Sequence, residues 1–310
     1  MKKTASILLS LTLLLGLMTA CGGGSKDNEP AANAPAVETP AASSNSAGTD
    51  APAEEPADEA KWADGVYYAE GDYAEKSGYK EILALKVEGG AITGVNWNAL
   101  HKDGGLDKKT LSEEGKYGMK AKGNAQAEWH EQAAKLEQFL LEQQATDAIT
   151  LDAEGKTDAV SGVSIGAGEF VALVNEALAA GPVEAGPYKD GSYHSEAAEF
   201  DAKSGWKETV HVTVMNGNIV AASWNGVHKD GGTDKVTRSK DGEYGMKANG
   251  GAQAEWHEQA AKAEQFLLEK QDPAAIPFNA EDGKTDAISG VSIHVNGFVE
   301  LAGQALAQAK

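Results

Sequence analysis

Two nearly identical segments carry the residues best suited to chemistry. The segment "TDAVSGVSI" spans residues 157–165, and "TDAISGVSI" spans residues 285–293. Each places a serine hydroxyl, on Ser164 or Ser292, just after a glycine that allows the backbone to approach a neighbouring group closely. Two small, hydroxyl-bearing, glycine-centred segments at the same place in a longer repeat indicate a shared structural or chemical function.

The position of each segment, directly before an amphipathic helix, suits a phosphate group. In the first copy the apolar residues of the following segment recur at helical spacing: Phe170, Val171, Val174 and Leu178. This helix should end at Gly181, and we expect Asp158 or Ser161 to cap its start. Because a helix N-terminus offers unpaired N–H groups and partial positive charge, Ser164 would hold its hydroxyl where a phosphate is favoured. An ordinary Ser-Gly turn is the alternative.

The two segments belong to a duplication that covers the chain from Lys61 onward. "WNALHKDGGLDK" at residues 97–108 matches "WNGVHKDGGTDK" at residues 224–235. A repeat of about 127 residues is far longer than a solenoid unit, so the pattern indicates domain duplication. We therefore predict two tandem homologous domains, at residues 61–183 and 184–310, each long enough for its own core.

Within each copy, the hydrophobic pattern predicts a hairpin followed by helices. Apolar and polar residues alternate on both sides of Gly89-Gly90 in the first copy and of Asn216-Gly217 in the second. A helix follows, with its apolar residues on one face: Trp129, Ala133, Leu136 and Leu140. The predicted fold class is α+β, with each domain a small, mainly antiparallel sheet packed with helices.

The repeated segment resembles the flavinylation motif of FMN-binding domains, Asp-x-x-Ser/Thr-Gly-Ala-Thr/Ser. An initial Asp-Gly-x-Tyr, here at residues 64–67, and a hairpin with a central Gly belong to the same pattern, and the resemblance covers nearly all of each repeat. The architecture is similar to that of flavin-carrying lipoproteins of extracellular electron transfer. The motif ends in Val-Ser here rather than the more usual Ala-Thr, and serine offers the same nucleophilic oxygen.

This resemblance implies a cofactor and the residues that hold it. An FMN transferase would use FAD and Mg²⁺ to join FMN, through a phosphoester, to the last hydroxyl of each motif, giving two FMN per chain. The acceptors would be Ser164 and Ser292; if the transferase passes over serine, FMN would bind without a covalent link. The residues that shape the motifs would be Asp158, Ser161, Gly162, Asp286, Ser289 and Gly290.

A flavin ring is flat and largely apolar, so aromatic faces and sulfur suit it. Each copy supplies the same set of such residues: Trp97, Tyr117, Met119 and Trp129, then Trp224, Tyr244, Met246 and Trp256. We interpret Trp129 and Trp256 as core residues, since they lie on the apolar face of a predicted helix. Trp97 and Trp224 end a strand before a Gly-rich loop and are the better stacking candidates. That loop is interpreted as mobile and solvated, with a lid over the cofactor as the alternative.

Two pairs of histidines are also duplicated: His101 with His228, and His130 with His257. We include them among the candidate cofactor-binding residues. Imidazole titrates near neutral pH, so a histidine can form a hydrogen bond to a reduced flavin or relay a proton beside it. Capping or packing is the principal alternative. A metal site is the weakest of the three interpretations, since no local spacing of metal ligands such as H-E-x-x-H is present.

The N-terminus predicts export and a lipid anchor. A basic start and a short apolar run, followed by Cys21, resemble a lipoprotein signal peptide over residues 1–20 with its acylated cysteine. Residues 21–60 are rich in Ala, Pro, Gly, Ser and acidic side chains, which predicts a disordered tether. The chain has one cysteine, so a disulfide within the chain, a Cys-ligated iron–sulfur cluster and a c-type haem are excluded. The predicted location is the extracytoplasmic face of a bacterial membrane.

Charge and motif content narrow the functional classes. The net charge of −20 and the lack of a basic stripe argue against nucleic-acid binding. The sequence shows neither a hydrolase triad at readable spacing nor a P-loop. We expect an electron-transfer flavoprotein, rather than a substrate-specific enzyme, that passes electrons from a membrane dehydrogenase or quinol to extracellular acceptors. The alternatives are a non-redox lipoprotein that binds a quinone or metabolite, and a structural surface module with empty pockets.

Overall fold

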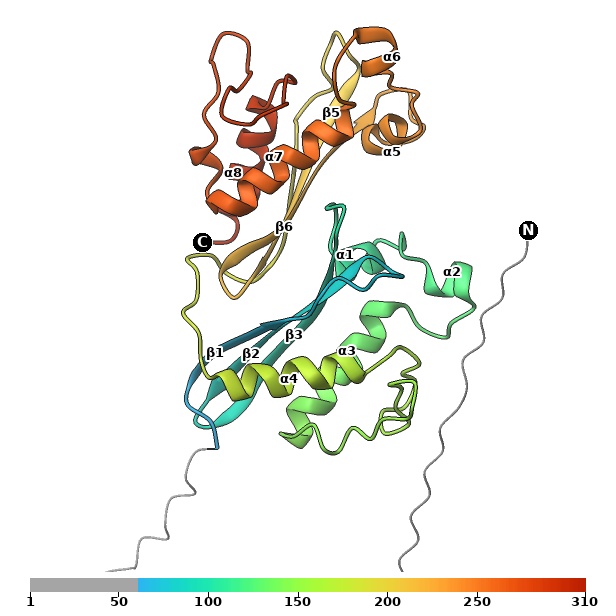
Figure 1. The fold of residues 1–310 in the computed structure, drawn as a ribbon, viewed down its shortest axis with the longest axis vertical. Coiled ribbons are helices and arrows are strands. Elements are labelled where there is room, and N and C mark those ends of the chain that lie inside the picture. Colours follow the sequence, from blue (N-terminus) through green and yellow to red (C-terminus); the bar gives the residue numbers. More distant parts are fainter. Residues whose placement is uncertain (1–60) are drawn as a thin grey trace, which may run out of the picture. The chain divides into compact units, whose positions relative to one another are not determined.

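The computed structural model describes residues 61–310, which form two similar halves with the same order of elements (Figure 1). The predicted signal peptide, the predicted lipidation site at Cys21 and the predicted tether lie outside these residues. The predicted α+β class with antiparallel sheets is confirmed. None of the helices in residues 61–310 combines the length and apolar character needed to span a membrane.

The first half is a three-stranded antiparallel sheet covered by helices. Its elements are β1 (Gly65–Glu70), β2 (Tyr79–Glu88), β3 (Ala91–His101), α1 (Lys108–Glu113), α2 (Met119–Gly123), α3 (Trp129–Gln143) and α4 (Gly168–Ala180). The strands follow the order β1-β2-β3, and the predicted hairpin is the β2–β3 turn at Gly89 and Gly90, whose φ angles are 60° and 76°. These left-handed conformations explain why glycine occupies both turn positions.

The second half repeats this plan. Its elements are β4 (Gly191–Glu196), β5 (Trp206–Met215), β6 (Asn218–His228), α5 (Lys235–Lys240), α6 (Met246–Gly250), α7 (Trp256–Lys270), the short 3₁₀ helix η1 (Pro273–Ala275) and α8 (Asn296–Ala307). In both halves the Gly-rich loop after the hairpin, which was interpreted as mobile, contains two short helices. These are α1 and α2 in the first half and α5 and α6 in the second. The first of these, α1 or α5, begins where Asp107 or Asp234 accepts a hydrogen bond from the N–H group three residues later.

A glutamine fixes the end of each long helix to the hairpin. Gln144 follows α3 with a positive φ of 55°, and its side chain accepts from the N–H of Ile92 and donates to the carbonyl of the same residue. Gln271 makes the same two bonds to Ile219. Each long helix is therefore held at a fixed position along its sheet.

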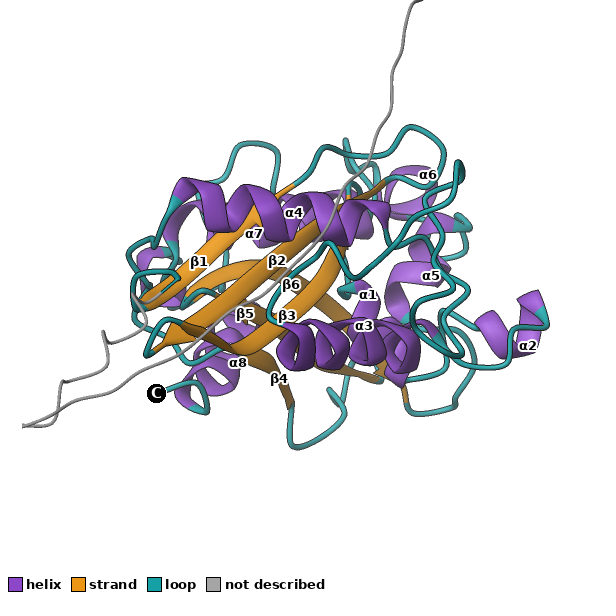
Figure 2. Ribbon diagram, turned by 90° about the horizontal axis from the view of Figure 1, so that it is seen from below, coloured by secondary structure: helices purple, strands orange, loops and turns teal. Residues whose placement is uncertain are grey.

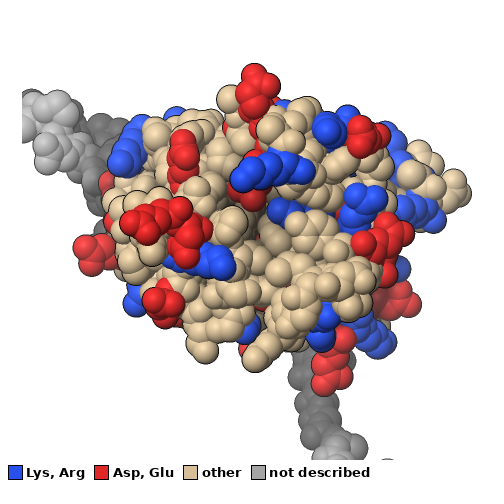
Figure 3. Space-filling view, turned by 90° about the horizontal axis from the view of Figure 1, so that it is seen from above, with Lys and Arg blue, Asp and Glu red and all other residues tan. Residues whose placement is uncertain are grey.

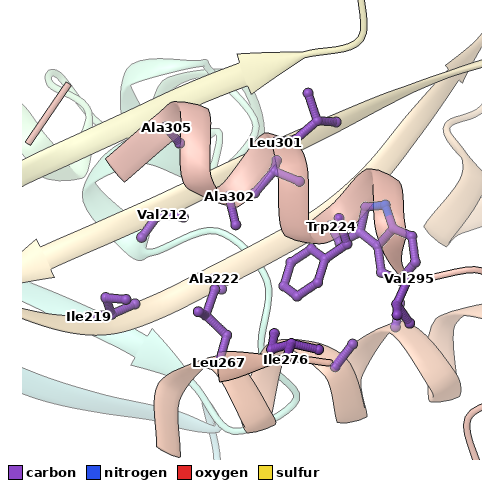
Figure 4. Packing of buried hydrophobic residues seen from close by; sticks show 14 of the residues in the cluster. Val212, Ile219, Ala222, Trp224, Leu267, Ile276, Val295, Leu301, Ala302 and Ala305 are labelled. Atoms are coloured by element: carbon purple, nitrogen blue, oxygen red, sulfur yellow. The ribbon is translucent and has the colours of Figure 1, made fainter. Parts of the chain in front are cut away.

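The core of each half lies between one face of the sheet and the two longer helices. Figure 2 shows α3 and α4 lying over one face of the sheet of β1, β2 and β3. In the second half, Trp224, Leu267 and Phe298 belong to one buried cluster between β5, β6, α7 and α8, part of which is shown in Figure 4. A smaller cluster joins the other faces of the two sheets through Ile82, Leu100 and Met215.

Candidate functional site

The repeated serine lies in a loop that leads into the last helix of each half, and not at the helix start itself. α4 begins at Gly168, with Ala167 as its N-cap, so the prediction that Asp158 or Ser161 caps this helix is wrong. The N–H groups of Ala167 and Gly168 donate to the carbonyl of Gly155 at 2.7 and 3.1 Å. An earlier turn therefore satisfies the N–H groups of the N-cap and of the first helical residue, and no side chain caps this helix.

A buried glutamine on the long helix holds the serine loop in place. Gln132, only 1% exposed, uses its Oε1 to accept hydrogen bonds from the N–H of Ser164 (2.7 Å), its hydroxyl (3.1 Å) and the N–H of Ile165 (3.2 Å). Gln259 makes the equivalent three bonds in the second half. The sequence reasoning missed this glutamine, although a polar residue repeated on the apolar face of both helices was a usable signal.

A lysine one turn further along the helix approaches the same loop. The Nζ of Lys135 lies 3.4 Å from the carbonyl oxygens of Ser161 and Gly162. Gly162 has a φ of 75°, a left-handed conformation that favours glycine, and a Cβ there would force the Lys135 ammonium group to move. Lys262, Ser289 and Gly290 repeat the arrangement, and this positive charge beside an exposed serine suits a phosphate.

The exposed Ser164 stands beside a cavity. The cavity has a volume of about 400 Å³, within the range of roughly 300–1,000 Å³ that is usual for small-molecule and cofactor sites. Ile165, next to the serine, forms part of its wall. The other lining residues are Glu81, Lys108, Tyr117, Met119, Trp129, Glu154, Gly155, Gly166, Gly168 and Glu169. The wall therefore combines aromatic and sulfur-bearing side chains with glycines that leave the backbone accessible.

A buried lysine surrounded by aromatic rings lies in this wall. The Nζ of Lys108 is 5.0 Å from the ring centre of Tyr79, 5.4 Å from that of Tyr117 and 4.8 Å from that of Trp129. Burial lowers the pKa of Lys108, while the nearby Glu81 carboxylate opposes that shift. Such cation–π contacts stabilise a cation that has left water.

The carboxylate opposite this lysine, that of Glu81, is partly buried. Burial raises the pKa of Glu81 to about 7, although the Lys108 ammonium and the indole N–H of Trp97, which donates to Glu81 at 3.0 Å, both oppose the shift. In the second half Lys235 lies 3.8 Å from Glu208 and is surrounded by Trp206, Tyr244 and Trp256. The sequence reasoning missed this pair, for which the repeated Glu81 and Glu208 near the start of β2 and β5, and the repeated Asp-Lys at residues 107–108 and 234–235, were the available signals.

The structure brings some predicted residues to the cavity and places others elsewhere. Tyr117 and Met119 line it, while Tyr244 packs against Lys235 and Met246 against the second core. The interpretation of Trp129 and Trp256 as core residues is confirmed, and Trp129 also lines the cavity. Trp97 and Trp224, the expected stacking candidates, are instead completely buried. Trp97 lies 5.0 Å from Trp129 and 5.1 Å from Phe170 between ring centres. Its position on the inner face of β3, under α4, removes it from the cavity surface.

The duplicated histidines occupy structural positions. His130 and His257 each form a 2.9 Å hydrogen bond through Nδ1, to Ser112 and Ser239 respectively. His101 and His228 pack edge-on against the aromatic residue at the start of β2 or β5. Asp158 and Asp286 are exposed in the motif loops. Within residues 61–310, no cluster of three or more His, Cys, Asp or Glu side chains is arranged to hold a metal ion.

Replacing Gln132 by alanine is expected to lower the free energy of unfolding by about 2–3 kcal/mol, because three buried or partly buried donors lose one acceptor. Gln259→Ala should have a similar effect in the second half. Urea denaturation measures the change. Gln138→Ala on the exposed face of α3 is the control, and an equal loss in that variant would contradict the assigned role of Gln132.

Comparison with known proteins gives two structural matches. No family model matches the chain, and no curated protein sequence matches it. A solution NMR structure of a Clostridium thermocellum protein is 56% identical over 39% of this chain and 91% of its own length, with a TM-score of 0.32. A crystal structure of the CPE2226 protein from Clostridium perfringens is 28% identical over 39% of this chain and 88% of its own length, also with a TM-score of 0.32.

Proposed function

We propose that this protein is a membrane-anchored, extracellular electron carrier that holds one FMN at the Ser-Gly-Val-Ser loop of each half. Cys21 would carry the lipid anchor, and an FMN transferase would attach the cofactor to Ser164 and Ser292. A membrane dehydrogenase or quinol would supply electrons, and extracellular acceptors would receive them. Acidic and basic side chains are interspersed on the face seen in Figure 3, which fits a soluble carrier with several partners.

One observation carries the proposal: in the first half, the loop that holds the acceptor hydroxyl lies between a lysine ammonium and a cavity lined by aromatic residues. In the first half Lys135 reaches the loop of Ser164 from α3, and Ile165 on the other side lines the 400 Å³ cavity. The same scaffold of Gln259, Lys262 and Ser292 recurs in the second half. A phosphate monoester with a flat apolar ring is the type of ligand that would use both features.

The cavity residues fit FMN in their chemistry. Lys135 would offset the negative charge of the phosphate, and Tyr117, Met119 and Trp129 would contact the ring while excluding water. Gly166 and Gly168 leave room for a ligand beside the backbone. Bound flavin supplies the electron-accepting chemistry, and the chain's own residues bind and orient it.

The attachment reaction is balanced without any oxidant or reductant. The serine Oγ forms a bond to the FMN phosphorus of FAD, the bridging P–O bond to the adenylate breaks, and AMP leaves. The serine proton passes to solvent or to the transferase. In the structure, the Ser164 hydroxyl donates to Gln132 Oε1, so its oxygen lone pairs are available for the new bond.

Full-length protein made together with its FMN transferase should contain two equivalents of flavin that stay with the chain after denaturation. Ser164→Ala and Ser292→Ala should each remove one equivalent, and the double variant should be colourless. Absorbance of the denatured protein and the masses of the two motif peptides are the measurements. Ser77→Ala and Ser204→Ala, at equivalent exposed positions outside the motifs, are the matched controls and should keep both equivalents. Native protein without any flavin would reject the proposal and favour a non-redox binding protein.

A further inference from the structure

Two histidines of the second half face each other across neighbouring strands. His194 on β4 lies directly opposite His211 on β5 in the antiparallel register. Their ring centres are 4.3 Å apart, and the ring planes are inclined by 41°. Neither belongs to the duplicated histidine pairs, because the first half has Tyr68 and Ala84 at these positions. The scaffold that the two halves share therefore does not explain this pair.

The register places the two side chains at the closer type of cross-strand position. The N–H of Ala197 donates to the carbonyl of Glu208, so these two opposed residues form a hydrogen-bonded pair. Hydrogen-bonded and non-hydrogen-bonded pairs alternate along an antiparallel ladder. The same register continues to His194 and His211, which are therefore a non-hydrogen-bonded pair. Side chains in such pairs lie closer together and share one face of the sheet.

The pair lies on the outer face of the second sheet, away from the core of that half. His211 stands between the core residues Val210 and Val212, and adjacent residues of a strand point to opposite faces. His194 is exposed, and His211 is partly exposed. Within residues 61–310, the ring nitrogens of both make no hydrogen bond to the protein, since Gln308 donates only to the backbone carbonyl of His194. The nitrogen lone pairs are therefore available to a ligand.

The surroundings of the pair carry charges of both signs. Burial is the main cause that lowers the pKa of His211; His194 and Lys116 lower it further, and Glu114 and Asp107 oppose the fall. On the same face of β4, the nearby acidic side chain already has a cationic partner: Glu196 pairs with Lys207 at 2.7 Å. A lowered pKa keeps the His211 imidazole neutral at neutral pH, and the neutral imidazole is the form that binds metal ions.

We propose that His194 and His211 form a binding site for one divalent transition-metal ion, with Zn²⁺ as its test ion. This site goes beyond the proposed flavin function and does not depend on it. Imidazole nitrogen is a common ligand of such ions, at about 2.0–2.1 Å from Zn²⁺. Two nitrogens bound to one ion are then about 3–3.5 Å apart. The neighbouring rings reach this separation through a small rotation of the exposed His194 side chain.

The site is open, because two protein ligands leave the other coordination positions of the ion to water. In the described part of the chain, no third His, Cys, Asp or Glu side chain is arranged to complete a metal centre with the pair. We therefore expect weaker binding than at a closed structural zinc site with four protein ligands. The ion would join β4, at the edge of the second sheet, to the central strand β5. Since the unfolded chain does not hold the two rings together, bound metal should stabilise the folded protein.

Isothermal titration calorimetry of the full-length protein, carrying no histidine tag, tests the site with ZnCl₂ at pH 7.5. The wild type should bind one Zn²⁺ per chain at this pair. His194→Ala and His211→Ala should each weaken that binding at least about tenfold, since each removes one of the two ligands. His294→Ala removes an exposed imidazole elsewhere in the second half and should leave the affinity unchanged. Absence of Zn²⁺ binding by the wild type, or unchanged binding in both single variants, would overturn the inference.

A variant that copies the first half separates metal binding from folding. His194→Tyr combined with His211→Ala introduces the residue types of Tyr68 and Ala84. This variant should keep the circular dichroism spectrum of the wild type and lose Zn²⁺ binding at the pair. In the wild type, the apparent affinity for Zn²⁺ should fall at least about tenfold from pH 7.5 to pH 5.5, because protons compete for imidazoles that ordinarily titrate near pH 6.5. Full Zn²⁺ binding by the folded double variant, or an affinity that does not change with pH, would overturn the inference.

Discussion

Replacing Trp97 by alanine is expected to lower the free energy of unfolding by about 3–5 kcal/mol, the usual cost of removing a large aromatic side chain from a core. The Trp97 ring is completely buried and packs against Trp129 and Phe170. Its indole N–H also donates to Glu81 at 3.0 Å, so the substitution leaves a partly buried carboxylate with one hydrogen bond fewer. Equilibrium unfolding in urea, followed by circular dichroism, measures the change.

The second half provides a matched control that separates packing from hydrogen bonding. Trp224 is equally buried, but in the described part of the chain its indole nitrogen makes no hydrogen bond within 3.5 Å, although it lies near enough to Glu208 to lower the pKa of that carboxyl. Trp97→Phe should therefore cost about 1–2 kcal/mol more than Trp224→Phe, because only the first removes a bond. If Trp97→Ala left stability unchanged and altered only the flavin spectrum, Trp97 would be a stacking residue and its placement in the core would be contradicted.

Local sequence patterns were sufficient to predict the fold. The alternation around Gly89-Gly90 and the helical spacing from Trp129 to Leu140 each depend on residues close together in the chain. Because the domain is duplicated, each of these patterns occurs twice in the sequence. β1 was not predicted, because its pairing with β2 depends on a neighbouring strand and its own residues alternate only weakly. The turn at Gly155 that replaces a helix cap was missed for the same reason, since its partners lie twelve residues further along.

The candidate site was predicted only in part, because its contacts join distant segments. The serine, its glycine and two cavity residues, Tyr117 and Met119, were readable from the repeated motifs. The bonds from Gln132 to Ser164 span the long helix and the loop after it, and no local pattern specifies them. The same holds for Glu81 and Lys108, which reach one cavity from β2 and α1.

Replacing Glu264 by glutamine is expected to stabilise the protein at pH 8 by about 3–4 kcal/mol, the value of a pKa rise from about 4.3 to about 7. Burial raises the pKa of Glu264 to about 7, against the backbone N–H of Trp224 and the more distant Lys240, which lower it. In the unfolded chain this carboxyl titrates near 4.3. Its protonated form therefore favours folding below about pH 4.3, and that contribution is lost as pH rises through about 7. Glutamine keeps the acceptor for the Trp224 N–H and carries no charge at any pH.

The equivalent residue of the first half should respond with the opposite sign, because it has the partner that Glu264 lacks. Glu137 accepts from the Trp97 N–H in the same way but also pairs with Lys109 at 2.9 Å, whereas the second half has Val236 at the lysine's position. Glu137→Gln should therefore destabilise the protein at pH 8, and Val236→Lys should stabilise it by supplying the missing ammonium. The measurement is urea denaturation of each variant and the wild type at pH 5 and pH 8. Destabilisation by Glu264→Gln at pH 8 would show that the carboxylate is already compensated in the folded protein.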